Sequence, residues 1–221
     1  STKVYSRSGY TPLVNTTITN FRTYARKLGD DFGQLDWRYF ILQLLYLVEY
    51  ADYNSQEVLG LGNTTNTSTV ASGGCDTLGM KSGTLINDGK HSVIYRGIED
   101  VFGNIWQFVD GININNHQVS ISYDSENNKS LTYKTATADG YWNKLGFDPI
   151  NPLISFPISV ISKEGESEVD YYKQNTGNRI ALVGGRRGND SSNVIGLWYW
   201  ANDSYASYSV SYCGARILRY N

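Results

Sequence analysis

The chain has 221 residues, of which 40% are hydrophobic and 18% charged, and its formal net charge is −2. This length is enough for one substantial domain with a buried core, and 18 Tyr, 7 Phe and 5 Trp exclude a disordered tail. The absence of a Lys/Arg cluster excludes a nucleic-acid binder that works by neutralising phosphates. The longest apolar run, residues 40–48, is far shorter than the ~20 residues that cross a bilayer, so we expect no membrane insertion.

Two amphipathic helices are predicted near the N-terminus. Apolar residues recur at helical spacing through residues 17–28, with Asn15 or Thr16 as the cap and Gly29 as the stop. A second helix is predicted to start near Asp36. Its expected core-facing stripe consists of Trp37, Phe40, Ile41, Leu44, Leu45, Val48 and Ala51. The helical part of the chain therefore spans residues 15–55.

Short strands and loops follow the helices. Residues 60–90, rich in Gly, Thr, Ser and Asn, are predicted to be loop, and residues 98–109 to be either a short helix or a turn followed by a strand. Pro149, Pro152 and Pro157 indicate a further loop. The expected strands are 92–95, a hairpin of 120–123 with 130–135, and three late strands at 180–185, 196–201 and 215–220. This order predicts an α+β fold with several short antiparallel strands in a single domain, residues 1–221.

The sequence offers little catalytic chemistry. Only His91 and His117 could serve a nucleophile relay, and neither lies beside a recognisable nucleophile motif. The acids Glu99, Asp100 and Asp110 are candidates for glycosidase work by position alone. The chain has no GxGxxG or P-loop motif, and Cys75 and Cys213 form no zinc pattern. We therefore predict a non-enzymatic protein without metal or cofactor, whose two cysteines form either one disulfide or two buried thiols.

One segment has an unusual composition. Between residues 186 and 213, 15 of 28 residues are Asn, Asp, Ser or Tyr, against 59 of the other 193. Their codons AAY, GAY, AGY and UAY differ from the Asn codon at an adenine, so adenine mutagenesis of Asn codons produces this mixture. Gly184-Gly185-Arg186 precedes the segment, Gly196-Leu197-Trp198 lies within it, and Gly214-Ala215-Arg216 follows it.

These elements resemble the variable proteins of diversity-generating retroelements, whose prototype is the phage major tropism determinant. The run 102–109, FGNIWQFV, is similar to the Gly-Asn-Val-Trp-Glu-Trp-like core motif of the same fold. The resemblance implies a C-type-lectin-type fold of the formylglycine-generating-enzyme variant, with a variable ligand-binding segment at 186–213. The active-site cysteine pair of the enzyme subgroup is missing, so we do not expect that activity.

A diversified face requires exchangeable side chains on a fixed backbone, and Tyr with Ser and Asn suits adaptable binding. The expected buried anchors are Val194, Ile195, Leu197, Trp198, Val210, Ile217 and Leu218. The expected ligand-binding residues are Asn189, Asp190, Ser191, Asn193, Tyr199, Trp200, Asn202, Asp203, Ser204, Tyr205, Ser207, Tyr208, Ser209, Ser211 and Tyr212.

The resemblance thus implies a receptor-binding or surface adhesin of a virus or prophage, located on the virion surface or outside the cell. Its expected partner is a protein or glycan receptor on a host or target cell, and self-association into a homo-oligomer such as a trimer stays open. One alternative is a glycan-binding lectin or glycan-active enzyme, because Trp200-Ala201-Asn202-Asp203 is similar to the Trp-Asn-Asp calcium motif of C-type lectins. The other is a structural particle protein whose tyrosines pack against partner subunits.

Overall fold

The computed structural model describes residues 4–122, 128–162, 170–188 and 195–220. Its helices lie near the N-terminus: α1 (Ile18–Arg26), α2 (Tyr39–Tyr50), α3 (Ser55–Leu59) and the single 3₁₀ turn η1 (Asp76–Leu78). Helix α1 begins after Thr17, whose hydroxyl accepts a hydrogen bond from the backbone of Asn20. Helix α2 ends at Ala51, which adopts a left-handed conformation. Both predicted helices are confirmed with somewhat shorter bounds, but the predicted caps are wrong: Thr17 and not Asn15 or Thr16 caps α1, and Arg38 and not Asp36 is the N-cap of α2.

The rest of the described fold is mainly strand. The strands are β1 (Phe32–Gln34), β2 (Ile94–Tyr95), β3 (Ile98–Glu99), β4 (Trp106–Asn115), β5 (Gln118–Ser122), β6 (Asn128–Lys134), β7 (Gly140–Phe147), β8 (Ser155–Ile161), β9 (Tyr171–Gln174), β10 (Asn178–Val183), β11 (Trp200–Ser204), β12 (Cys213–Gly214) and β13 (Ile217–Arg219). The protein is therefore a mixed α+β fold, as predicted.

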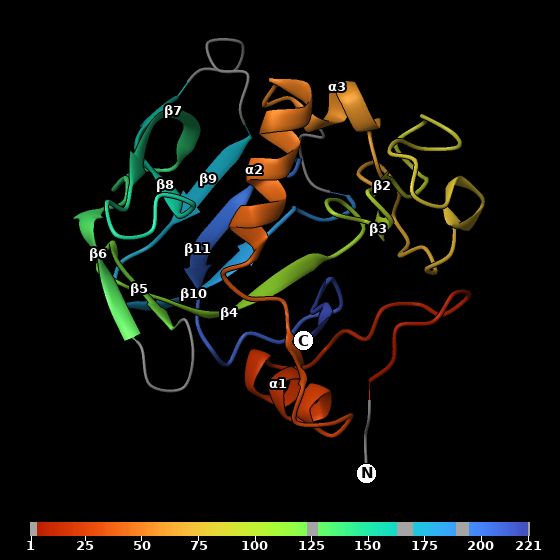
Figure 1. The fold of residues 1–221 in the computed structure, drawn as a ribbon, viewed down its shortest axis with the longest axis horizontal. Coiled ribbons are helices and arrows are strands. Elements are labelled where there is room, and N and C mark those ends of the chain that lie inside the picture. The colour runs from red at the N-terminus through yellow and green to blue at the C-terminus, as the bar shows by residue number, and fades with distance from the viewer. Residues whose placement is uncertain (1–3, 123–127, 163–169, 189–194, 221) are drawn as a thin grey trace.

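One large sheet organises the molecule (Figure 1). Its strands lie in the order β6-β5-β4-β10-β11-β9-β7-β8, and β12 pairs in parallel with β4 at Trp106 and Gln107. Most neighbours are antiparallel, but β11 runs parallel to β9. Strand β1 pairs with β13 in a separate two-stranded sheet, which joins the start and the end of the chain. The pairings of β12 with β4 and of β13 with β1 together hold the last part of the chain in place.

Helix α2 packs across the large sheet (Figure 1). Phe40 stacks on Trp200 of β11 with ring centroids 5.0 Å apart, and it meets Phe156 of β8 edge to face at 5.3 Å. Tyr39 and Gln43 each donate a hydrogen bond to the carbonyl of Leu197. The aromatic contacts and the two polar contacts together hold the helix to the strand that leads into the candidate site.

The predicted apolar stripe of α2 is partly wrong. Leu44, Leu45 and Val48 are exposed, Val48 by 76%, whereas the buried positions include Gln43 and Tyr46. The helix carries apolar residues around most of its circumference, so periodicity alone misplaced the buried face by about one residue. Its polar Gln43 is buried because the amide has a backbone carbonyl to bond.

Several other expectations are settled by the fold. Cys75 and Cys213 are free and buried, so they are two buried thiols. Residues 98–109 are a turn and strands without a helix, and the hairpin of β5 and β6 is confirmed. The segment 196–199 is a turn and not a strand, and Pro157 lies within β8. Among the described residues, no helix combines the length and apolar character that a membrane crossing requires.

Candidate functional site

The burial of the composition-biased segment changes abruptly between Asn202 and Asp203. Every described residue from 195 to 202 is buried, whereas every residue from 203 to 212 is exposed or half-buried. The predicted face therefore divides into a buried part and a surface part. Asn189, Asp190, Ser191, Asn193 and the anchor Val194 lie outside the described residues.

The expectation that Tyr199, Trp200 and Asn202 point outward is wrong. All three are fully buried: Tyr199 meets Trp106 edge to face at 4.6 Å, and Trp200 packs under α2. Asn202 donates to the hydroxyl of Tyr172 at 3.3 Å. Composition suggested exposure, but β11 is a central strand covered by a helix, so its side chains belong to the core. Three predicted anchors are confirmed as buried, namely Ile195, Leu197 and Trp198, whereas Val210, Ile217 and Leu218 are only partly buried.

The surface part forms a compact face after β11. Asp203 and Ser204 end the strand, and Tyr205, Ser207 and Ser209 are exposed. A shallow open hollow lies in this face. Its lining comes entirely from the predicted segment: Asp203, Ser204, Tyr205, Ser207, Tyr208, Ser209 and Val210. Hydroxyls and aromatic rings around a hollow can bind a polar ligand by hydrogen bonding and stacking.

Two arginines lie against the tyrosines of this face. The guanidinium of Arg179 is 3.8 Å from the ring centroid of Tyr205, and that of Arg186 is 4.2 Å from the ring of Tyr212. The hydroxyl of Tyr208 donates to that of Tyr212 at 3.4 Å, and burial raises the pKa of Tyr208 above its ordinary value. The tyrosines thus form one connected surface with a cation at each end.

The backbone of the face is held from several sides. Asn15 donates to the carbonyl of Val210 at 3.0 Å, and Trp106 donates to the carbonyl of Tyr212 at 2.9 Å. Arg187 donates to the carbonyls of Thr67, Asn104 and Ser211. The contacts to Val210, Ser211 and Tyr212 use main-chain atoms of the face, so the side chains between them can change without loss of these anchors.

A buried carboxyl group anchors the turn before β11. The backbone N–H of Trp198 donates to Asp170 at 2.7 Å, and that of Leu197 donates to the hydroxyl of Ser55 at 2.9 Å. Gly196 leaves room for both groups, because a Cβ there would lie 2.6 Å from the Ser55 hydroxyl and still closer to Asp170. Burial raises the pKa of Asp170 to about 8, with the Trp198 N–H acting in the opposite direction.

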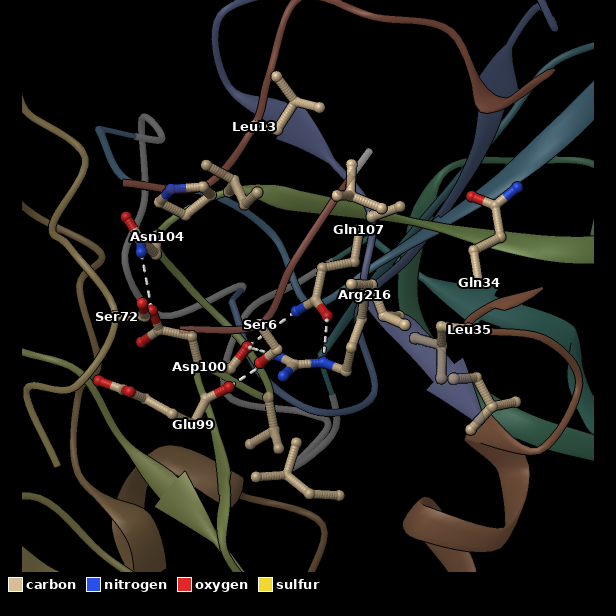
Figure 2. A pocket seen from close by; sticks show the side chains of 18 of the residues that line it. Ser6, Leu13, Gln34, Leu35, Ser72, Glu99, Asp100, Asn104, Gln107 and Arg216 are labelled. Atoms are coloured by element: carbon tan, nitrogen blue, oxygen red, sulfur yellow. Dashed lines mark hydrogen bonds between the residues drawn. The ribbon is translucent and has the colours of Figure 1, made fainter. Parts of the chain in front are cut away.

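A second cavity of about 600 Å³ lies elsewhere, beneath the N-terminal segment 4–13 (Figure 2). Arg216 enters it and donates from Nε to Gln107 and from Nη2 to the carbonyls of Glu99 and Asp100. Burial lowers the pKa of Arg216, while the nearby carboxylates act in the opposite direction. With its guanidinium engaged by framework atoms, Arg216 serves here to hold β13 against the 99–107 segment.

Several of the candidate catalytic groups are bonded to other parts of the fold. Asp110 forms an ion pair with Arg22, Glu99 accepts from the backbone of Gly73 at 2.6 Å, and His91 bonds Asp88 at the surface. Burial raises the pKa of Asp100 to about 6, where its carboxylate accepts from Asn104. Within the described part of the chain, no three His, Cys, Asp or Glu residues are placed to hold a metal ion.

Sequence reasoning did not identify Arg179 as part of the face. This residue opens an apolar strand, a place where an arginine ordinarily reaches solvent, and nothing local in the sequence links it to Tyr205. The strand pairing supplies that link, because Ile180 of β10 lies opposite Ser204 of β11.

Comparison with known proteins adds no relative. No family model matches the chain, and no curated protein matches it either.

Proposed function

We propose that this protein is a non-enzymatic ligand-binding protein that displays residues 203–212 as an exchangeable binding face. The observation that carries the proposal is the coincidence of the composition bias with exposure after Asn202. The polar and tyrosine side chains of this stretch all reach the surface, while the main chain beneath them is bonded to residues outside it. A face of this kind can vary in sequence at little cost to the stability of the fold.

The wider proposal follows the sequence resemblance. We infer a variable protein of a diversity-generating retroelement with a C-type-lectin-type fold, presented on a virion or outside the cell. Its partner is a protein or glycan receptor on a target surface, and Tyr205, Tyr208 and Tyr212 supply the aromatic contacts. The retroelement part is tested by sequencing the locus. A near-identical template copy that differs only at adenines supports it, and the absence of a copy removes it.

The binding part is tested without knowledge of the receptor. A yeast-display library randomises the exposed positions 203, 204, 205, 207, 208, 209, 211 and 212, and a matched library randomises the buried positions 199, 200 and 202. We expect the first library to keep protease resistance in most clones and to yield binders to a model protein such as lysozyme. The second library should lose protease resistance. Equal loss in both libraries, or no binders from the first, contradicts the proposed face.

The same clones separate the alternatives. A particle protein whose tyrosines pack between subunits predicts that Tyr205→Ser with Tyr208→Ser abolishes assembly, whereas our proposal predicts normal folding and lost attachment. A glycan-active enzyme predicts turnover on glycan-array hits that Glu99→Gln or Asp110→Asn removes.

A further inference from the structure

Arg179 is a buried charge without a counter-charge. It lies on β10 opposite Ile114 of β4, and only 6% of the residue is exposed. Its Nε and Nη1 atoms are buried and have no hydrogen-bond partner. In the described part of the chain, no carboxylate forms an ion pair with it. Buried guanidinium groups in proteins are ordinarily paired, so this one has binding capacity that the fold does not use.

The ring of an exposed tyrosine lies against this guanidinium. The Tyr205 ring lies 3.8 Å from Arg179 Cζ, and Tyr205 itself is 60% exposed and borders the hollow of the face. The cation–π contact offsets part of the desolvation cost but leaves the N–H groups unsatisfied. Tyr205 both lines the hollow and contacts the guanidinium, and rotation of an exposed tyrosine is fast, so a small movement of this ring can bring a bound group to Arg179.

We infer that Arg179 binds a carboxylate carried by the receptor, with Tyr205 packing beside the bound group. This inference rests on the proposed binding face and specifies the chemistry of its ligand. The planar fork of a guanidinium matches a carboxylate through two parallel hydrogen bonds. One arginine balances one negative charge, and Asp203 at the rim of the hollow disfavours a more highly charged phosphate.

The surroundings also favour an anionic partner. Arg186 and Arg187 direct their guanidinium groups to backbone carbonyls, which leaves their positive charges unneutralised by any described carboxylate. Arg186 stands over Tyr212, at the opposite end of the tyrosine surface from Arg179. Long-range attraction of these cations would bring an acidic ligand to the face, and the attraction would weaken as salt is added.

The test measures binding of the full chain to immobilised polymers by biolayer interferometry at low and high salt. The probes are poly-L-glutamate and polysialic acid, which carry carboxylates on a peptide and on a glycan, with heparin and neutral dextran for comparison. We expect salt-sensitive binding to one or both carboxylate polymers. Arg179→Gln should weaken it at least about tenfold and Arg179→Lys less, because lysine keeps the charge but lacks the fork. The control Arg219→Gln, which alters an exposed arginine paired with Asp31, should leave binding unchanged.

A Tyr205 variant and a measurement of stability provide two further tests of the inference. Tyr205→Ser removes the ring that packs beside the bound group and should weaken binding to the carboxylate polymers. Arg179→Gln removes an uncompensated buried charge and should fold with an equal or higher Tm. No binding to either carboxylate polymer, or unchanged binding in Arg179→Gln, overturns the inference, as does a lower Tm with binding unaffected. If library binders keep their affinity in Arg179→Gln, the proposal of a bound carboxylate is wrong but the proposed binding face is not. If the library yields no binders, the proposed binding face itself is wrong.

Discussion

Replacing Asp170 by asparagine should change the stability of the protein in a pH-dependent way. The carboxyl group is buried and accepts the backbone N–H of Trp198 at 2.7 Å, at the turn that leads into β11. Burial raises its pKa from 3.8 to about 8. Asparagine keeps an oxygen for the Trp198 N–H but cannot ionise, so the variant isolates the titration of this one group.

The magnitude follows from proton linkage. Between pH 3.8 and pH 8 the unfolded chain has released a proton that the folded chain retains, so rising pH costs stability. The cost is about 1.4 kcal/mol per pH unit, which amounts to about 4 kcal/mol at pH 7. Asp170→Asn does not incur this loss. Its extra amide hydrogen adds a penalty that does not depend on pH, which shifts the difference without changing its slope.

Urea unfolding of both proteins at pH 5, 6, 7 and 8 measures the difference directly. We expect the free energy of unfolding of Asp170→Asn, minus that of the parent chain, to rise steadily from pH 5 to pH 8. Other carboxylates titrate equally in both proteins and cancel. A difference that is constant over this range would show that Asp170 is ionised in the folded protein, and the reasoning from burial would be refuted.

Three further outcomes follow from the packing. Trp200→Ala should cost about 3–5 kcal/mol in urea unfolding, because this buried ring stacks under α2, whereas Tyr205→Ser should cost less than about 1 kcal/mol. Gly196→Ala should destabilise by about 1–3 kcal/mol and lower Tm, because its Cβ would meet Ser55 and the Asp170 carboxylate. The thiols of Cys75 and Cys213 should react with a thiol reagent only after the protein unfolds. Both thiols are buried, and burial raises the pKa of Cys75 to about 12 and raises that of Cys213 as well. Rapid labelling of the native protein would contradict this prediction.

The sequence predicted the elements whose signals are local. The helix at 18–26 was predicted from the regular apolar spacing of residues within a few positions of each other, although its cap is Thr17 and not Asn15 or Thr16. The sequence does not predict the hairpin of β7 and β8, because Pro157 is typical of a loop. In the structure this proline lies in β8 opposite Leu145, in the last strand of the sheet order, where a missing N–H is tolerated.

The sequence predicts which segment contains the candidate site, but not which residues of that segment reach the surface. Composition distinguishes residues 186–213 from the rest of the chain. The burial of Asn202, however, depends on Tyr172 and on helix α2 over β11, which are both distant in the sequence. Arg179 was missed for the same reason, since its relation to Tyr205 arises only from the pairing of two strands. Long-range packing therefore decided which members of the segment reach the surface.

The genetic code would protect part of the buried segment from adenine-directed mutation. Trp198, Trp200, Ala201 and Cys213 are buried, and their codons carry no adenine in the first two positions, so an adenine-directed mutator would leave these amino acids intact. The tyrosines beyond Asn202, and the serines where they use AGY codons, are one adenine change from asparagine. The buried Ile195, Tyr199 and Asn202 also have adenine in these codon positions, so an adenine-directed mutator would produce variants that fail to fold at these three places.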